Sequence, residues 1–263
     1  MTWLIFESSP WVLPVLFFIV LTLLIEVPFR MRGLLTKSSA VKTGDWDVVQ
    51  VALFTLASFV LGLSFAQASG RYDTRRALVV QEANAIGTTW LRADQLDRGE
   101  EKRFRSVLTD YTAERLTAYG STDRSVHERA IELSDVYQSE LWQISSSALA
   151  AHPNNLGLSL LMQTLNDTID VSAEQLQALT AHVPTAIVTL MLALSALAML
   201  AAGLRFARDG SRPLVLSVVL IAASVIVVSM AIDYDRPQQG FITVSLAPMQ
   251  RQLDSMRVPA GEP

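Results

Sequence analysis

The sequence predicts an all-α membrane protein, with four transmembrane helices and a membrane-proximal helical-bundle insertion between the second and third spans. Two observations predict this class. Just over half of the 263 residues are apolar and only 17% are charged, against roughly 25% in soluble domains. The shortage of charge is local, because charged residues nearly vanish from four segments while residues 71–180 have an ordinary soluble composition.

The four apolar segments are each long enough to cross a bilayer core of roughly 30 Å as a helix. They cover residues 11–29, 48–68, 183–204 and 213–232. Trp46 stands at the start of the second segment, where an interfacial anchor is common, and Pro213 suits the first turn of the fourth. Because a backbone in lipid must satisfy its own hydrogen bonds, all four segments are expected to be helices.

Between the second and third spans, apolar residues recur at helical steps of three and four, which predicts four bundle helices. Gly120 is expected to end the second of them, and His152-Pro153 the third. No Gly or Pro interrupts residues 71–86 or 158–183. The first and fourth bundle helices are therefore expected to be direct extensions of spans two and three.

This pattern divides the chain into four parts. Residues 1–70 hold transmembrane helices 1 and 2 with a basic connecting loop, and residues 71–182 form the helical-bundle insertion. Residues 183–233 hold transmembrane helices 3 and 4, and residues 234–263 form a C-terminal tail. Within the tail, Ser245 is a candidate cap for a short amphipathic helix through Met249, Leu253 and Met256.

The distribution of basic residues favours one orientation in the membrane. The two short loops hold seven basic side chains: Arg30, Arg32, Lys37, Lys42, Arg205, Arg208 and Arg212. Placing both loops in the cytoplasm satisfies the positive-inside rule and puts the insertion on the extracytoplasmic side. Arg71, Arg75 and Arg76 on the insertion side oppose this placement, but they are fewer.

Composition argues against several classes of function. A net charge of −4 does not indicate a nucleic-acid partner, and no basic patch with interleaved aromatic residues supports one. The absence of Cys removes thiolate metal sites and Cys nucleophiles. His127, His152 and His182 stand apart from one another and from carboxylate pairs. The sequence therefore predicts no enzyme, no metal and no cofactor.

Span two contains a stripe of small and polar residues, because Thr55, Ser58 and Gly62 follow one another at steps of three and four. Two interpretations stay open. Small residues allow two helices to approach closely. Alternatively, the stripe lines a water-filled path in an oligomer, where water solvates polar groups at membrane depth.

Three charged residues follow span four directly: Asp233, Asp235 and Arg236. A structural ion pair is the favoured interpretation, in which Asp233 or Asp235 meets an arginine of residues 71–76. Ion binding is the less favoured alternative.

Two pieces of the chain resemble a family of bacterial membrane proteins. They are "RYDTRRALVVQEANAIGTTWLRADQL" with "LNDTIDV", and the tail "DYDRPQQGFITVSLAPM". Together they are similar to the bestrophin-like family, whose domain has no assigned function. "SFVLG" followed by "RYDTRRALV" resembles the second span of bestrophins more distantly.

Bestrophins are oligomeric ion channels, pentameric as a rule, and their second span lines the pore. The resemblance implies an apolar neck at four-residue spacing, which would fall here on Thr55, Phe59 and Leu63. It also implies a cytosolic helical domain, opposite to the side that the loop charges favour.

The favoured hypothesis is a homo-oligomeric ion channel, tetrameric or pentameric, in a multi-pass position in the bacterial inner membrane. Its partners would be the lipid bilayer, further copies of the chain and permeant inorganic ions. The expected pore or gate residues are Thr55, Ser58, Phe59, Gly62 and Leu63. The expected vestibule or intersubunit residues are Arg71, Arg75, Arg76, Glu82, Asn84 and Thr88. The alternative is a non-conducting sensor or scaffold that binds a partner through the insertion.

Overall fold

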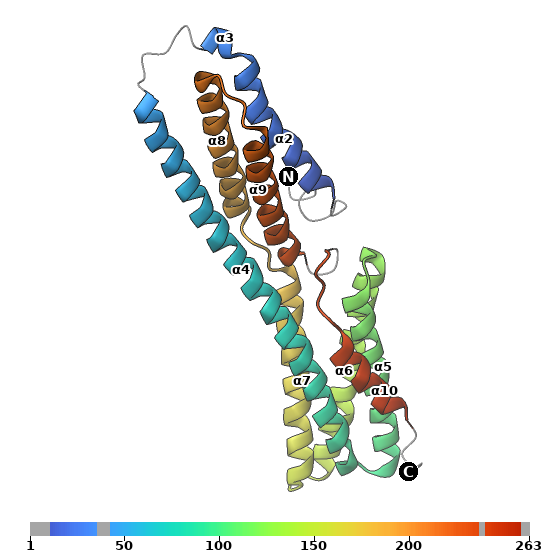
Figure 1. The fold of residues 1–263 in the computed structure, drawn as a ribbon. Helices are drawn as coiled ribbons and strands as arrows, with labels where there is room; N and C mark the ends of the chain where they lie inside the picture. Colours follow the sequence, from blue (N-terminus) through green and yellow to red (C-terminus); the bar gives the residue numbers. More distant parts are fainter. Residues whose placement is uncertain (1–10, 36–42, 237–239, 259–263) are drawn as a thin grey trace. The chain divides into compact units, whose positions relative to one another are not determined.

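The computed structural model describes residues 11–35, 43–236 and 240–258, and these residues form helices without any strand (Figure 1). The all-helical class predicted from the sequence is confirmed. The chain forms two compact units. The first comprises residues 1–72 and 182–243, and the second comprises residues 73–181 and 244–263.

The first unit holds the apolar helices. They are α2 (Val12–Arg30), the first part of α4 (Thr43–Arg92), α8 (Thr185–Asp209) and α9 (Leu214–Asp235), with the short α3 (Arg32–Leu35) after α2. Four helices among the described residues are long and apolar enough to cross a membrane. This agrees with the four spans predicted from composition.

Helices α2 and α8 pack closely at Gly203. A Cβ atom added there would lie 2.6 Å from the backbone oxygen of Leu24 and 2.8 Å from the Cα atom of Ile25. Both distances are shorter than real Cβ contacts, so any side chain at residue 203 would push the two backbones apart. Ala198 and Ala202 are buried in the same helix, and small residues of this kind let membrane helices approach.

Helix α4 runs without interruption over 50 residues, from Thr43 to Arg92. The expected continuation of span two into the insertion is therefore confirmed. A helix propagates where neither Pro nor a stretch of polar turn residues stops it, and Gly62, Gly70 and Gly87 inside α4 are not sufficient to break it.

The expected continuation of the fourth bundle helix into span three is wrong. Helix α7 (Leu156–Thr180) ends at the C-cap residue Ala181, and α8 begins after Pro184 at its N-cap. Pro184 donates no backbone hydrogen bond, and its ring disfavours helical geometry at the preceding Val183. The four residues 181–184 are consequently not helical.

The second unit is a bundle of amphipathic helices. It contains the second part of α4, the short 3₁₀ helix η2 (Ala93–Gln95), α5 (Arg98–Gly120), α6 (Arg124–Ala151) and α7. Their apolar faces meet in one core that includes Ile86, Phe104, Leu108, Leu141 and Leu161. The expected ends of the second and third bundle helices, at Gly120 and before His152, agree with the structure.

The tail contains an eleven-residue helix, α10 (Ala247–Arg257), that belongs to the second unit. Met249, Leu253 and Met256 are buried along one face of it, as expected for an amphipathic helix. The backbone N–H of Ala247 lies 3.4 Å from the Ser245 hydroxyl oxygen, while Leu246 occupies the N-cap. The helix therefore packs as predicted and begins one residue later than a Ser245 cap implies.

Candidate functional site on helix α4

The five residues predicted for the pore or gate are all exposed on α4 in the isolated subunit. Phe59 has 68% of its surface exposed and Leu63 has 50%. The hydroxyl of Thr55 donates a 2.8 Å hydrogen bond to the carbonyl oxygen of Val51, so its proton is satisfied within the helix. This part of α4 thus presents one aromatic ring, one leucine side chain and hydroxyls together to its surroundings.

The surroundings of Gly62 bear on the two interpretations of the stripe, close helix packing or a water-filled path. Within one subunit they do not support close packing. A Cβ atom added at Gly62 would meet nothing within 4 Å, whereas one added at Gly203 would strike the backbone of α2. Close approach inside the subunit therefore occurs at Gly203. The stripe at Thr55, Ser58 and Gly62 is exposed, so it is available to contact lipid, water or another subunit.

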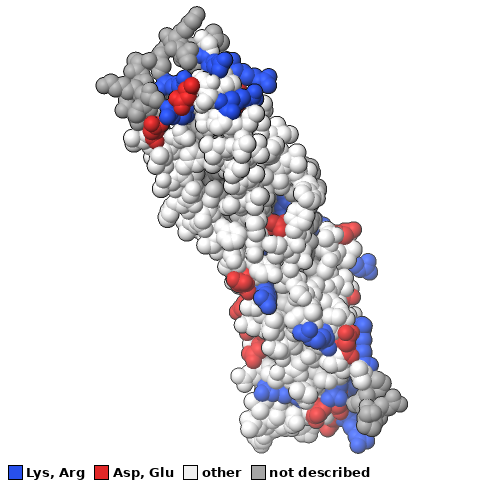
Figure 2. Space-filling view, viewed as in Figure 1, with Lys and Arg blue, Asp and Glu red and all other residues white. Residues whose placement is uncertain are grey.

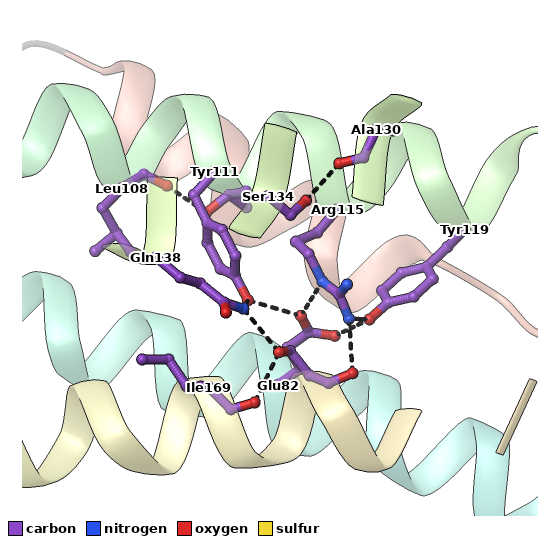
Figure 3. Close-up of polar contacts among 11 residues, drawn as sticks. Glu82, Leu108, Tyr111, Arg115, Tyr119, Ala130, Ser134, Gln138 and Ile169 are labelled. Carbon is purple, nitrogen blue, oxygen red and sulfur yellow. Dashed lines mark hydrogen bonds and ion pairs between the residues drawn. The ribbon is translucent and has the colours of Figure 1, made fainter. Parts of the chain in front are cut away.

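The second part of α4 carries a buried carboxylate, Glu82, whose partners come from α5 (Figure 3). Arg115 Nε donates a 2.7 Å hydrogen bond to Glu82 Oε1, and the Tyr119 hydroxyl donates a 2.6 Å hydrogen bond to Oε2. Both side chains of the ion pair are almost fully buried, at 0% exposure for Glu82 and 4% for Arg115. Burying two charges is costly unless geometry and further hydrogen bonds compensate, and here both carboxylate oxygens have a donor.

Further side chains from α5, α6 and α7 complete this network. Arg115 Nη2 contacts the Tyr119 hydroxyl and donates a 3.1 Å hydrogen bond to the carbonyl oxygen of Ser172. Gln138 Nε2 donates to the Ser172 hydroxyl oxygen at 2.9 Å and to the Tyr111 hydroxyl oxygen at 3.3 Å (Figure 3). Four helices are thereby joined by one set of buried polar contacts.

Burial governs the protonation of this network. It raises the pKa of Glu82 above its ordinary value, and the charge and hydrogen bond of Arg115 oppose that rise. Burial and the nearby Glu82 charge raise the pKa of Tyr111 to about 12. The Tyr111 hydroxyl thus keeps its proton well into alkaline pH, and it donates a 3.4 Å hydrogen bond to Glu82 Oε1.

Two of the predicted vestibule residues need a correction, because Glu82 and Arg75 are buried within the subunit. Neither can line a vestibule or an intersubunit face in this packing. The reason is that each side chain finds its hydrogen-bonding partners inside its own bundle. Asn84, Thr88 and Arg76 are exposed on α4, and Arg71 is half-buried.

Arg75 caps the carboxyl end of α7. It donates a hydrogen bond through Nε to the carbonyl oxygen of Ala178 and one through Nη2 to that of Ala181, both at 2.9 Å. The last carbonyl groups of a helix have no partner within it, and the negative end of the helix dipole attracts a cation. The buried Arg75 therefore satisfies two backbone acceptors at the point where the helix stops.

The charged residues after span four hold backbone groups of the first unit. Asp233 accepts 2.9 Å hydrogen bonds from the backbone N–H groups of Phe241 and Ile242. Asp235 accepts one from the backbone N–H of Val183 and lies 3.5 Å from His182 Nδ1. Arg236, also buried, is the C-cap residue of α9. These contacts fix the ends of α8 and α9, and the predicted ion pair with an arginine of residues 71–76 stays a prediction.

The sequence contained a signal for the buried pair, although periodicity alone did not identify it. Tyr111, Arg115 and Tyr119 follow one another at steps of four on the buried face of α5. An arginine at such a position requires an acceptor. Glu82 is the carboxylate on the inward side of α4 that meets this requirement.

Known proteins resemble this chain both in sequence and in fold. Residues 47–249 match the model of the bestrophin-like domain. A crystal structure of a bacterial bestrophin homologue from Klebsiella pneumoniae with a mutation is similar to this chain with a TM-score of 0.72 at 15% identity, covering 95% of this chain and 98% of that one. A structure of the homologue phased by Zn-SAD gives 0.64 at 16% identity, covering 92% and 96%. A search of curated proteins found no match.

Proposed function

Because this chain belongs to the bestrophin-like family, we propose that it assembles into a homo-oligomeric ion channel whose pore is lined by the first part of α4. The observation that carries this proposal is the exposed face with Thr55, Phe59 and Leu63. Its residues recur at four-residue spacing, so they lie along one side of the helix.

The interior of the first unit supports a pore between subunits over a pore within one. Its core is filled by apolar side chains, among them Phe17, Leu21, Met191 and Ile221. Water and ions have no favourable partners in such a core. A conducting path would therefore need a surface shared by several copies, and the α4 face is a candidate for it.

Phe59 and Leu63 would act in this channel as an apolar constriction. Narrow apolar segments oppose the passage of ions because water leaves them, which is gating by dewetting. The hydroxyls of Thr55 and Ser58 would offer oxygen ligands beside the constriction. Asn84, Thr88 and Arg76, exposed further along α4, would line the vestibule on the extracytoplasmic side that the basic loops favour.

Recording from the purified protein in planar bilayers tests the proposal. Wild-type protein is expected to conduct, and Phe59→Ala and Leu63→Ala are expected to raise the current severalfold, because each widens the apolar constriction. Leu190→Ala on α8 is a matched control, since Leu190 is 49% exposed and Leu63 is 50% exposed. The control should leave the current unchanged.

Oligomeric state in detergent separates the channel from a non-conducting sensor or scaffold. A ring of four or five subunits supports the proposal. Monomers or dimers, together with silence of wild type and Phe59→Ala at all voltages, would overturn it in favour of the sensor.

A further inference from the structure

A cavity of about 160 Å³ opens on the first unit between α2 and α9. Its walls are mostly apolar and include Phe18 and Ile25 from α2, Phe206 from α8, and Val218 and Ile221 from α9. Phe18 and Val218 are exposed on helices that are apolar enough to cross a membrane. The cavity is thus an apolar recess in a surface that meets lipid chains.

Arg212 stands among the lining residues of this cavity, in the loop between α8 and α9. Its guanidinium lies over the ring of Phe29, 5.5 Å from the centroid, and Arg32 lies over the same ring at 5.2 Å. Both hydrogen bonds that Arg212 makes with described residues go from Nη2 to the Glu26 carboxylate, each at 2.6 Å. Its Nε and Nη1 groups make no hydrogen bond with the described residues, and the side chain is 48% exposed.

Positive charge is in excess around this end of the unit. Figure 2 shows arginine side chains, in blue, gathered at the upper end of the view. Among the described residues there, the arginines are Arg30, Arg32, Arg205, Arg208 and Arg212, and the carboxylates are Glu26, Asp47 and Asp209. The carboxylates are already paired, Asp47 and Asp209 with Arg205 and Glu26 with Arg30 and Arg212.

We propose that this cavity binds one anionic phospholipid, with part of an acyl chain between α2 and α9 and the phosphate group on Arg212. The apolar walls match the chain, and Arg212 at the wall shares the single Glu26 carboxylate with Arg30, which leaves net positive charge for an anionic headgroup. An arginine fork binds phosphate oxygens with directed, charge-assisted hydrogen bonds. The Glu26 carboxylate competes for the same guanidinium, which sets an upper limit on how strongly the lipid binds.

Native mass spectrometry of the purified protein in equal amounts of phosphatidylglycerol and phosphatidylcholine tests the proposal. The wild-type chain is expected to retain phosphatidylglycerol in preference. Arg212→Gln should lower this retention by about tenfold, the effect of one lost hydrogen bond to a charged group. Glu26→Gln should raise retention, because it removes the competing carboxylate. These opposite directions distinguish a headgroup site from a general loss of structure.

Filling the cavity tests the acyl-chain part separately. Thr22→Phe places a ring among the lining residues and should lower retention of phosphatidylglycerol, whereas Leu23→Phe, on the neighbouring exposed position of α2, should not. If Arg212→Gln does not fold, the double variant Glu26→Gln/Arg212→Gln replaces it, since it leaves no carboxylate unpaired.

Three outcomes would overturn the proposal: equal retention of both lipids by the wild type, unchanged retention in the Arg212 variants, or unchanged retention in Thr22→Phe. The measurement counts bound lipid and not current, so its result is independent of whether the protein conducts.

Discussion

Glu82 on α4 and Arg115 on α5 form a 2.7 Å ion pair that is closed off from solvent on all sides by the second unit. Removing one partner of such a pair leaves the other charge buried and uncompensated. Glu82→Ala is therefore expected to lower the free energy of unfolding by about 3–5 kcal/mol, measured by denaturant titration of the purified protein.

The exposed pair of Arg103 and Glu140 on the same bundle is the control. Glu140→Ala should change stability little, because solvent screens exposed pairs. The double variant Glu82→Met/Arg115→Met should be more stable than Glu82→Ala, since no lone charge remains. Equal losses for Glu82→Ala and Glu140→Ala would contradict the importance of burial.

Arg75 and Arg76 are neighbours in sequence with opposite environments, one buried and one exposed. Arg75→Met leaves the carbonyl oxygens of Ala178 and Ala181 without that donor and should cost about 2 kcal/mol or more. Arg76→Met should leave the thermal unfolding midpoint unchanged. Similar midpoints for the two variants would show that the cap does not contribute to stability.

Gly203 and Gly62 test where helices approach within the subunit. Gly203→Ala should destabilise the protein by about 1–3 kcal/mol, because the added methyl group overlaps the α2 backbone. The added methyl group of Gly62→Ala meets open space, and the substitution removes a flexible residue from a helix. It should therefore be neutral or stabilising, as measured by denaturant titration of the purified protein. A larger loss for Gly62→Ala would mean that its face is packed in the purified assembly.

Tyr111 predicts a dependence of stability on alkaline pH. The unfolded chain releases the phenolic proton near pH 10, while the folded chain holds it until about 12. Between these values the folded state binds more protons, so stability falls as pH rises, by about 2–3 kcal/mol in total. In Tyr111→Phe this part of the pH dependence should disappear. The same decline between pH 10 and 12 in both proteins would refute the assignment.

The sequence predicts those parts of the fold that depend on local composition. The four spans follow from uncharged runs, and the length of α4 follows from the lack of a breaker between Thr43 and Arg92. The break before α8 was missed because Pro184 acts on residues that precede it, inside a segment whose apolar period is unbroken. The spacing of apolar residues does not register that the Pro184 ring disfavours helical geometry at Val183.

The site could be predicted only in part, for a related physical reason. Exposure of Phe59 and Gly62 on α4 is a property of one helix face, which residue spacing describes. The partners of Glu82 and Arg75 lie on other helices, and spacing within one helix does not contain that information. Arg115 on the buried face of α5 indicated that a carboxylate was needed, but not which one.

The cap on α7 has a consequence for the order in which the protein can be completed during synthesis. Arg75 is 103 residues ahead of Ala178 in the chain, so at typical rates of translation it emerges about 5–20 s before its acceptor. Glu82 and Arg115 are separated by only 33 residues in the chain, so Arg115 is synthesised soon after Glu82. The Glu82–Arg115 pair can thus form early, while Arg75, about two helical turns before Glu82, has no α7 carbonyl to bind until the end of α7 has been synthesised. The contact between α4 and the end of α7 thus forms after the α4–α5 contact, and a ribosome that stalls before residue 178 leaves Arg75 without these two carbonyl acceptors.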